Sequence, residues 1–393
     1  MVKAMICLIG DQTIPNLMGV KKFRPEKIFL LHTRESRFIP LVQNMTEYFT
    51  QLIPGCRIET VEVDASNDDE TRGRCRMIIR ECGPENTLIN VTGGTKLMAF
   101  GALQAGHETG TRMIYVDTRQ DRFLQIGDTQ VSFPGGCSLP TLTTADFLGV
   151  GGIKVSRDFT EEAVLLRNRL EPLAHKVFAR INEWSITMTY LQEAAKKHYD
   201  PVSLRFCAPG IIRLNARKVF ECDEGILSDY ADAGLIRDLC AEKGSVSFQF
   251  CGKTEHDLVM KKGILAECLV FYAVRRFGGN DDVRIGLEYV WGTDPNHGIK
   301  NEIDVLVARR GRLYCFECKS GGTEKIQATD LSKLNEQAER IGGVFVNKVF
   351  VINGHRKIGG ELAKRAVEEG IKILKITDLH KDYVGTLTDI FSE

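Results

Sequence analysis

Two carboxylates and a lysine lie close together near the carboxyl end of the chain. Asp304 falls in one apolar stretch, and Glu317 and Lys319 fall in the next, which follows a turn at Gly311. Both stretches are typical of strands, so residues 302–319 are expected to form a hairpin. Glu317 and Lys319 then point to one face, with Asp304 beside them on the neighbouring strand. Such charges are costly to desolvate in an apolar sheet unless they serve a purpose, such as holding a divalent cation.

A further carboxylate, Glu267, interrupts a helix expected over 262–277 that is apolar on most sides. Asp304, Glu317 and Glu267 could hold Mg²⁺ or Mn²⁺, and the backbone carbonyl of Cys318 is a further oxygen ligand. The cation would polarise a scissile phosphate and lower the pKa of its water. The pattern therefore indicates phosphodiester hydrolysis.

Two questions stay open at this hairpin. Lys319 would either orient the attacking water or neutralise the negative charge that develops. Glu302 shares the face of Asp304 in a regular strand, and it either belongs to the site or only flanks it. The alternative to catalysis is a solvated surface hairpin, since Glu-x-Lys by itself is a common tripeptide.

The second candidate site is a turn rich in glycine and threonine that follows a buried strand and opens a helix. Its residues are Thr92, Gly93, Gly94, Thr95 and Lys96. Backbone amides in such a turn bind anions, helped by the helix N-terminus. The turn has neither the Walker P-loop pattern nor the G-x-G-x-x-G pattern of dinucleotide sites. Ligand binding is favoured over the alternative, a tight turn with a threonine cap.

Other loops at the same sheet edge are expected to share this ligand, because ligands bind where the strand order reverses. They contribute Asp11, Gln12 and Thr13 after the first strand and Thr33 after the second. Asn16 is a weaker candidate, because it follows a proline at a helix start, where proline is ordinary.

Strand and helix patterns alternate in the amino-terminal part. Strands are expected at 3–9, 27–32, 57–63, 86–91 and 112–117, with amphipathic stretches at 36–53, 68–81 and 95–109. This alternation predicts a Rossmann-like parallel sheet. In the last part, helices at 262–277, 327–341 and 358–369 and strands at 283–291, 302–308, 313–319, 348–353 and 371–376 predict an α/β/α domain.

The chain is expected to divide into four segments. Residues 1–135 form the ligand-binding domain, 136–160 a linker rich in Gly, Pro and Ser, 161–255 a helical connector and 256–393 the domain with the carboxylates. Helices are expected in the connector at 160–182, 184–198 and 226–242, with a small strand at 246–250. A winged-helix-like arrangement is one interpretation of it.

The bulk composition narrows the function classes. The chain has 393 residues, with 52 Lys plus Arg and 52 Asp plus Glu, so a nucleic-acid site must be a local patch. Its 12 cysteines have no repeating spacing and no secretory signal precedes them, which favours reduced thiols in a cytoplasm. No apolar run approaches the ~20 residues that span a bilayer, so no membrane partner is expected.

The two candidate sites together resemble the CARF–nuclease ancillary effectors of type III CRISPR systems. The amino-terminal motifs are G-D-Q-x-x-P-N and N-V-T-G-G-T-K-x-M, and the carboxy-terminal ones are N-E-I-D-V-L and F-E-C-K-S. The order of helix Glu, hairpin Asp and Glu-x-Lys is that of the PD-(D/E)xK nuclease core, although Ile303 stands where a proline would precede the Asp. The resemblance covers most of the chain, and residues 160–250 are the part that the motifs support least.

The resemblance implies a restriction-endonuclease-like domain and a homodimer that acts in antiviral defence. Paired CARF domains would bind a cyclic oligoadenylate, with cyclic tetra-adenylate the expected ring, across the two-fold axis. Binding would favour a state whose nuclease cleft admits DNA or single-stranded RNA. Two alternatives stay open: a cyclic-oligoadenylate-sensing regulator or nucleic-acid-binding protein without turnover, and a CARF domain that degrades its own ring.

Overall fold

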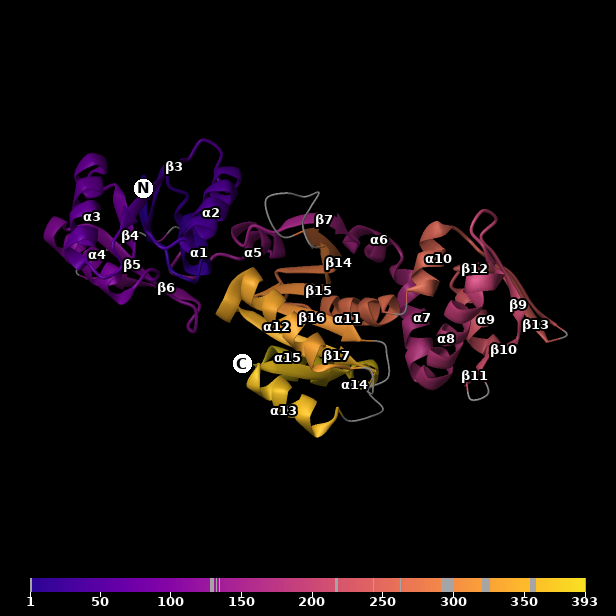
Figure 1. The fold of residues 1–393 in the computed structure, drawn as a ribbon. Helices are drawn as coiled ribbons and strands as arrows, with labels where there is room; N and C mark the ends of the chain where they lie inside the picture. Colours follow the sequence, from indigo (N-terminus) through magenta and orange to yellow (C-terminus); the bar gives the residue numbers. More distant parts are fainter. Residues whose placement is uncertain are drawn as a thin grey trace.

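The computed structural model describes residues 2–127, 131, 133, 135–215, 218–242, 244–261, 263–290, 300–319, 326–353 and 358–392. Three parts lie in a row, and their order in space differs from their order in the chain (Figure 1). The carboxy-terminal part lies in the centre, between the amino-terminal part and the segment that precedes it in sequence.

The amino-terminal part is the predicted Rossmann-like domain. Its sheet has the order β3-β2-β1-β4-β5-β6, in which only β6 is antiparallel to its neighbour. The strands are β1 (Ala4–Leu8), β2 (Lys27–Thr33), β3 (Arg57–Val63), β4 (Thr87–Asn90), β5 (Arg112–Asp117) and β6 (Arg122–Ile126). The helices are α1 (Ile14–Phe23), α2 (Phe38–Leu52), α3 (Asp68–Cys82) and α4 (Lys96–Thr109). The strand order reverses between β1 and β4, and the carboxyl ends of these strands therefore form the expected ligand edge.

Helix α1 was not among the predicted helices. Almost all of its residues are buried, so the stretch lacks the polar face that marks an amphipathic helix in a sequence. Helix α1 matters for the site because it begins immediately after the loop Asp11 to Thr13, which was predicted to contact the ligand.

The segment expected to be a linker, 136–160, is built into the fold instead. It forms α5 (Thr144–Val150) and β7 (Lys154–Asp158), and β7 pairs with β14 at the edge of the carboxy-terminal sheet. Thr143 and Asp146 form a capping box that starts α5. Asp146 also accepts hydrogen bonds from Lys21 Nζ (2.5 Å) and from the Tyr48 hydroxyl (2.8 Å), so the segment is tied to the amino-terminal domain.

The connector contains more β-structure than expected. Its helices are α6 (Thr160–Leu165), α7 (Arg167–Ala179), α8 (Ile181–His198), α9 (Glu224–Asp232) and α10 (Lys253–Met260). A sheet of order β12-β13-β9-β8 joins β8 (Tyr199–Asp200), β9 (Arg205–Pro209), β12 (Ile236–Glu242) and β13 (Ser245–Phe250), and β10 (Ile211–Asn215) pairs with β11 (Lys218–Glu221). The prediction of one helix over 226–242 was wrong in its second half, because Gly234, with φ of 68°, ends the helical run and β12 pairs with β13.

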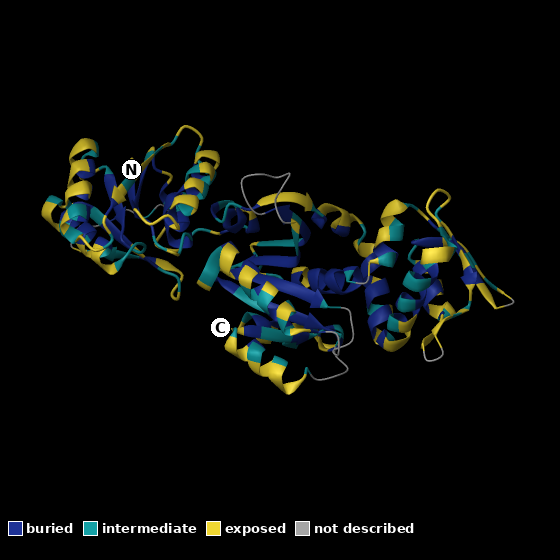
Figure 2. Ribbon diagram, in the orientation of Figure 1, coloured by how far each residue is buried: buried dark blue, intermediate teal, exposed yellow. Residues whose placement is uncertain are grey.

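The carboxy-terminal part has the predicted α/β/α layers around a sheet of order β18-β17-β16-β15-β14-β7. Its strands are β14 (Asp282–Val290), β15 (Lys300–Arg309), β16 (Arg312–Lys319), β17 (Val346–Ile352) and β18 (Ile371–Lys375). Its helices are α11 (Ile264–Phe277), α12 (Ala328–Gly342), α13 (Gly360–Glu368), α14 (Ile376–Lys381) and α15 (Tyr383–Phe391), with a short 3₁₀ turn at Gly343–Phe345. Helix α11 packs on one face and α12 on the other, each with a buried cluster of its own. Figure 2 shows α11 almost wholly buried, whereas α12 and α13 expose their outer faces.

Candidate active site

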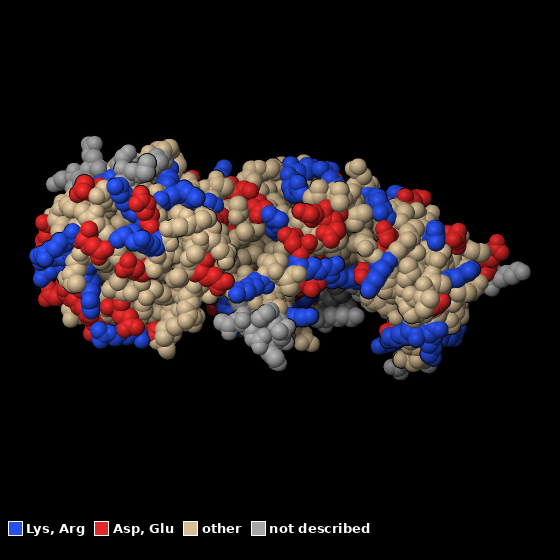
Figure 3. Space-filling view, turned by 90° about the horizontal axis from the view of Figure 1, so that it is seen from above, with Lys and Arg blue, Asp and Glu red and all other residues tan. Residues whose placement is uncertain are grey.

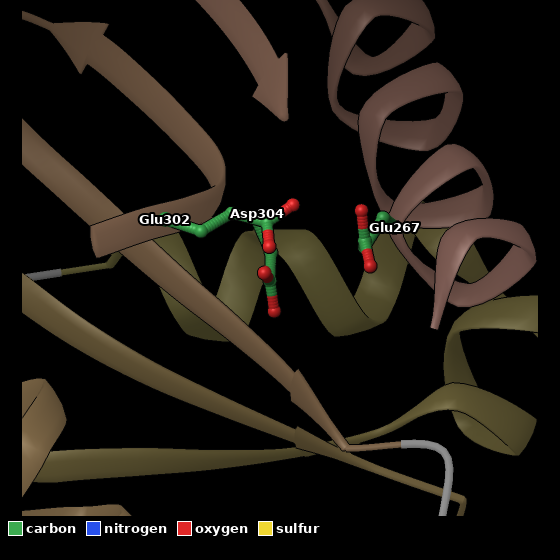
Figure 4. Close-up of side chains that lie close together, drawn as sticks. All are labelled: Glu267, Glu302 and Asp304. Atoms are coloured by element: carbon green, nitrogen blue, oxygen red, sulfur yellow. The ribbon is translucent and has the colours of Figure 1, made fainter. Parts of the chain in front are cut away.

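Three carboxylates converge from two elements of the carboxy-terminal part. Glu302 and Asp304 lie on β15, and Glu267 reaches toward them from the first turn of α11 (Figure 4). One oxygen from each of the three lies within 4.8 Å of the others. Strands β15 and β16 pair from Arg309–Arg312 as far as Val305–Phe316. Past the last pair, the backbone amide of Cys318 donates to the side-chain carboxylate of Asp304 (2.6 Å).

Burial makes this group of carboxylates electrostatically unfavourable by itself. Glu267 is 3% and Asp304 9% exposed, and Oε2 of Glu267 has no hydrogen-bond partner among the described residues. Burial raises the pKa of Glu267 to about 7, and Glu302 and Glu317 add to the rise while Lys261 and Lys319 oppose it. Burial also raises the pKa of Asp304, helped by Glu267 and Glu317, whereas the Cys318 amide lowers it. A bound cation would offset these costs.

The donor set fits a hard divalent cation. It consists of carboxylate oxygens, one of them buried without a partner, at a separation that one ion can bridge. Oxygen ligands of this kind suit Mg²⁺ or Mn²⁺ better than zinc, which prefers nitrogen and sulfur. Cys318 contacts the group through its backbone amide, which donates to Asp304.

Glu317 and Lys319 form an ion pair at the edge of this group. Lys319 Nζ lies 2.6 Å from Glu317 Oε1 and 3.7 Å from Asp330 Oδ1 on α12. Burial of Lys319 disfavours its charge, but the Glu317 carboxylate outweighs burial and raises its pKa. Glu317 thus pairs with a lysine here, and Glu302, which the sequence left open, is the third member of the carboxylate group. Metal ligation by Glu317 and by the Cys318 carbonyl stays a prediction.

Sequence reasoning missed one charged residue at this site, Lys261. It precedes α11 and its ammonium pairs with Oε1 of Glu302. The signal was weak, because a lysine between two helices is ordinary. Only the fold places it beside a residue forty positions further along the chain.

The glycine-threonine turn lies at the carboxyl end of β4, where it was expected. The Thr92 hydroxyl donates to Asn90 Oδ1 (2.6 Å) and accepts from the Val116 amide (2.8 Å). The Thr95 hydroxyl donates to the Ala65 carbonyl (2.8 Å) and caps α4 by accepting from the Met98 amide (3.2 Å). Both hydroxyls therefore hold the loop in place, as does the Thr92 amide, which donates to Asn90 Oδ1 (3.2 Å). An anion would contact the amides that follow it in the turn.

Glycine is required in this turn for steric reasons. A Cβ at position 93 would lie 2.1 Å from the Leu8 carbonyl oxygen, and Gly94 has φ of 73°. The turn therefore lies directly on the end of β1. Lys96, the first residue of α4, is exposed and available to an anionic ligand.

The structure divides the remaining predicted ligand residues. Asp11 is exposed and pairs with Arg37 (3.2 Å). Gln12 and Thr13 line a cavity with Asp11 and the carboxyl end of α12. Thr33 is 2% exposed, and its buried hydroxyl has no partner.

Asn16 requires a correction, since it is fully buried. Its side-chain amide donates to the Leu8 carbonyl (2.8 Å) and accepts from Asn90 Nδ2 (3.1 Å). The residue thus joins the ends of β1 and β4 from within, and we assign it to the support of the loops rather than to ligand contact.

Comparison with known proteins agrees with this architecture. Residues 4–133 match the Card1 CARF domain, and residues 262–376 match a domain of unknown function, DUF4143. Can2 from Sulfobacillus thermosulfidooxidans in complex with cyclic tetra-adenylate is similar over 100% of both chains, with 20% identity and a TM-score of 0.72. Protein VC1899 from Vibrio cholerae covers 99% of this chain and 98% of its own, with 16% identity and a TM-score of 0.77.

A third solved structure, a type III CRISPR defence DNA nuclease activated by cyclic oligoadenylate, matches 93% of this chain but only 52% of its own, with 16% identity and a TM-score of 0.54. The curated proteins contain no match to the chain. Among the described residues, the helices are too short or too polar to cross a membrane.

These findings define the class of protein. The chain has the fold of proteins that join a CARF domain to a carboxy-terminal α/β/α domain, as the sequence resemblance predicted. Within this fold, residues 4–133 are the part that matches the Card1 CARF domain.

Proposed function

We propose that this protein is a metal-dependent nuclease of type III CRISPR defence that a cyclic oligoadenylate activates. Its expected activator is cyclic tetra-adenylate, and its expected substrate is DNA, single-stranded RNA or both. The observation that carries the proposal is the group of Glu267, Glu302 and Asp304, whose oxygens lie within 4.8 Å of one another in a buried site. The Card1 CARF match supports the activator, as does the solved Can2 complex with that ring.

In this proposal the carboxylates hold Mg²⁺ or Mn²⁺, which supplies Lewis-acid activation of the phosphate and its water. Glu267 gives up its proton to do so, because its raised pKa leaves it partly protonated near neutral pH without the cation. The Glu317 carboxylate fixes the Lys319 ammonium by the 2.6 Å ion pair. From this position Lys319 donates N–H bonds to the attacking water or to the developing oxyanion.

The activator would bind at the turn from Thr92 to Lys96, through backbone amides and the Lys96 ammonium. A symmetric ring suits a homodimer, because each protomer then presents the same turn to it. Helix α12 offers a physical connection between the two sites. Its carboxyl end meets Gln12 and Thr13 in a shared cavity, and Asp330 in its first turn lies 3.7 Å from Lys319. A shift of this helix would therefore reach both the ligand loop and the catalytic lysine.

One assay tests the proposal. Purified protein with Mn²⁺ is offered labelled DNA and single-stranded RNA, with and without cyclic tetra-adenylate, alongside Glu317→Ala and Lys319→Ala. Cleavage that depends on both metal and ring, and is lost in the two variants, supports the nuclease. Ring binding without cleavage of either nucleic acid would favour the sensing regulator, and loss of the ring itself would favour ring degradation.

A further inference from the structure

We propose that Lys261 is a substrate-binding residue that contacts the phosphodiester backbone beside the metal site. The inference rests on the proposed nuclease function and adds a residue to it. Lys261 lies between α10 and α11, with its amide anchored to the Asp257 carbonyl (2.9 Å) and its ammonium paired with Oε1 of Glu302. It therefore contacts one of the three carboxylates from the solvent side.

The pair between Lys261 and Glu302 is suited to exchange. Its side chains are 48% and 35% exposed, and solvent-exposed ion pairs of this kind contribute little to stability. A divalent cation bound by Glu302 would take over that carboxylate and repel the ammonium. The cation would also draw in a phosphate, which then becomes the nearest anion for Lys261. A lysine is apt for this change, since it is a point charge on a flexible stem.

The two lysines of the site are held differently. Lys319 is half-buried and is fixed between Glu317 and Asp330. Lys261 has one exposed partner, Glu302, among the ion pairs of the described residues. The fixed position of Lys319 suits a donor to the reacting groups, and the exposed position of Lys261 suits contact with the substrate backbone.

A cleft borders both Lys261 and Glu302. It has a volume of about 90 Å³, and its charged lining residues are Lys261, Arg157, Asp257, Glu288 and Glu302. Gly286 also lines it, with φ of 60°, and a Cβ there would lie 3.0 Å from Phe159 Cβ, so this position depends on glycine. The cleft therefore brings Lys261 and Arg157 together next to one of the three carboxylates.

A second cation lies along this cleft. Arg157, Glu288 and Glu302 are neighbours across β7, β14 and β15, and Arg157 pairs with Glu288 (3.1 Å). A nucleic-acid strand at the metal site would thus meet Lys261 first and Arg157 further along. Figure 3 shows basic and acidic side chains interleaved on the face it presents, without one broad basic surface. Local contacts of this kind are what a chain without excess positive charge requires.

Binding is measured in a Lys319→Ala background, which prevents hydrolysis, with Mn²⁺ and cyclic tetra-adenylate. Anisotropy of a fluorescein-labelled single strand of DNA gives the affinity over a range of salt concentrations. Adding Lys261→Ala is expected to weaken binding about tenfold and to make the slope of log affinity against log salt shallower by about 0.7. Lys261→Arg keeps the charge and should retain most of the affinity. Lys253→Ala, at the start of α10 and outside the cleft lining, is the matched control.

Calorimetry of Mn²⁺ without nucleic acid separates this role from a structural one. Lys261→Ala should bind Mn²⁺ at least as tightly as the parent, because it removes a cation next to the ligands. An unchanged salt slope, or weaker Mn²⁺ binding, would overturn the inference and leave the nuclease proposal standing. Failure of the wild-type protein to cleave any strand with metal and ring would instead overturn the proposed function.

Discussion

Lys319 Nζ lies 2.6 Å from Oε1 of Glu317, two positions earlier on the same strand. Residues two apart on a strand share a face, so the pair needs no bend in β16. Glu317 is 6% exposed, and a buried carboxylate of this kind is stable when a cation accompanies it. The pair therefore presents a fixed ammonium next to the three-carboxylate group, which is the arrangement that the predictions below address.

Lys319→Ala should lower the rate of metal-dependent cleavage by about 10²-fold or more, because it removes a positioned donor from the reacting phosphate. The affinity for Mn²⁺ should change far less, because the substitution leaves all three grouped carboxylates in place. Single-turnover cleavage and metal calorimetry on the same preparation check the two halves. A variant that keeps its rate, or that loses metal and rate together, would contradict the assigned role.

Some residues of this site could be proposed from the sequence, and others could not. Asp304, Glu317, Lys319 and Glu267 were proposed as site residues from residue type and spacing, because strand and helix periodicities are local properties. Lys261 and the place of Glu302 were not, because they depend on how α11 approaches β15. No local pattern encodes that approach.

The same limit applies to the fold. Strands β1, β2 and β4 of the parallel sheet were predicted closely because they are buried and largely apolar. Helix α1 was missed for lack of a polar face, and β7 because its short, exposed sequence pairs with a strand more than a hundred residues away. Asn16 was misassigned because a buried polar side chain that supports a loop has the same sequence signature as one that binds a ligand.

Glu267→Gln should change the pH dependence of stability in the metal-free protein. The pKa of Glu267 is raised to about 7 from an ordinary 4.5, mainly by burial. The native state thus holds a proton that the unfolded chain has lost, and stability falls as pH rises from 4.5 to 7, by about 3 kcal/mol at most. Glutamine removes this loss.

Thermal unfolding in a chelator at pH 5 and pH 8 measures the effect. The wild-type Tm should drop more between these pH values than that of Glu267→Gln, and saturating Mn²⁺ should restore the wild-type Tm at pH 8. Equal drops in the two proteins would show that Glu267 does not carry the raised pKa.

Lys96→Ala should weaken the binding of cyclic tetra-adenylate by about tenfold, because it removes one charged contact to a phosphate at the start of α4. Cleavage at saturating ring should stay close to wild type, since Lys96 is remote from the carboxylates. Calorimetry gives the affinity, and Lys197→Ala, an exposed lysine on α8, is the matched control. An unchanged ring affinity would remove Lys96 from the binding site.

Asn16→Ala tests whether this residue supports the ligand edge or contacts the ligand. Removing the side chain takes a donor from the Leu8 carbonyl and one of two acceptors from the Asn90 amide, which keeps the Pro15 carbonyl (3.1 Å), and the loss in this fully buried place should cost about 1–3 kcal/mol of stability. Chemical denaturation without ligand should therefore report a loss, and Asn16→Asp should not restore it, because a carboxylate cannot donate to the Leu8 carbonyl. The opposite result, full stability combined with lost ring binding, would return Asn16 to the ligand site. Reduced stability is expected because the asparagine joins the two strands whose ends carry the turn.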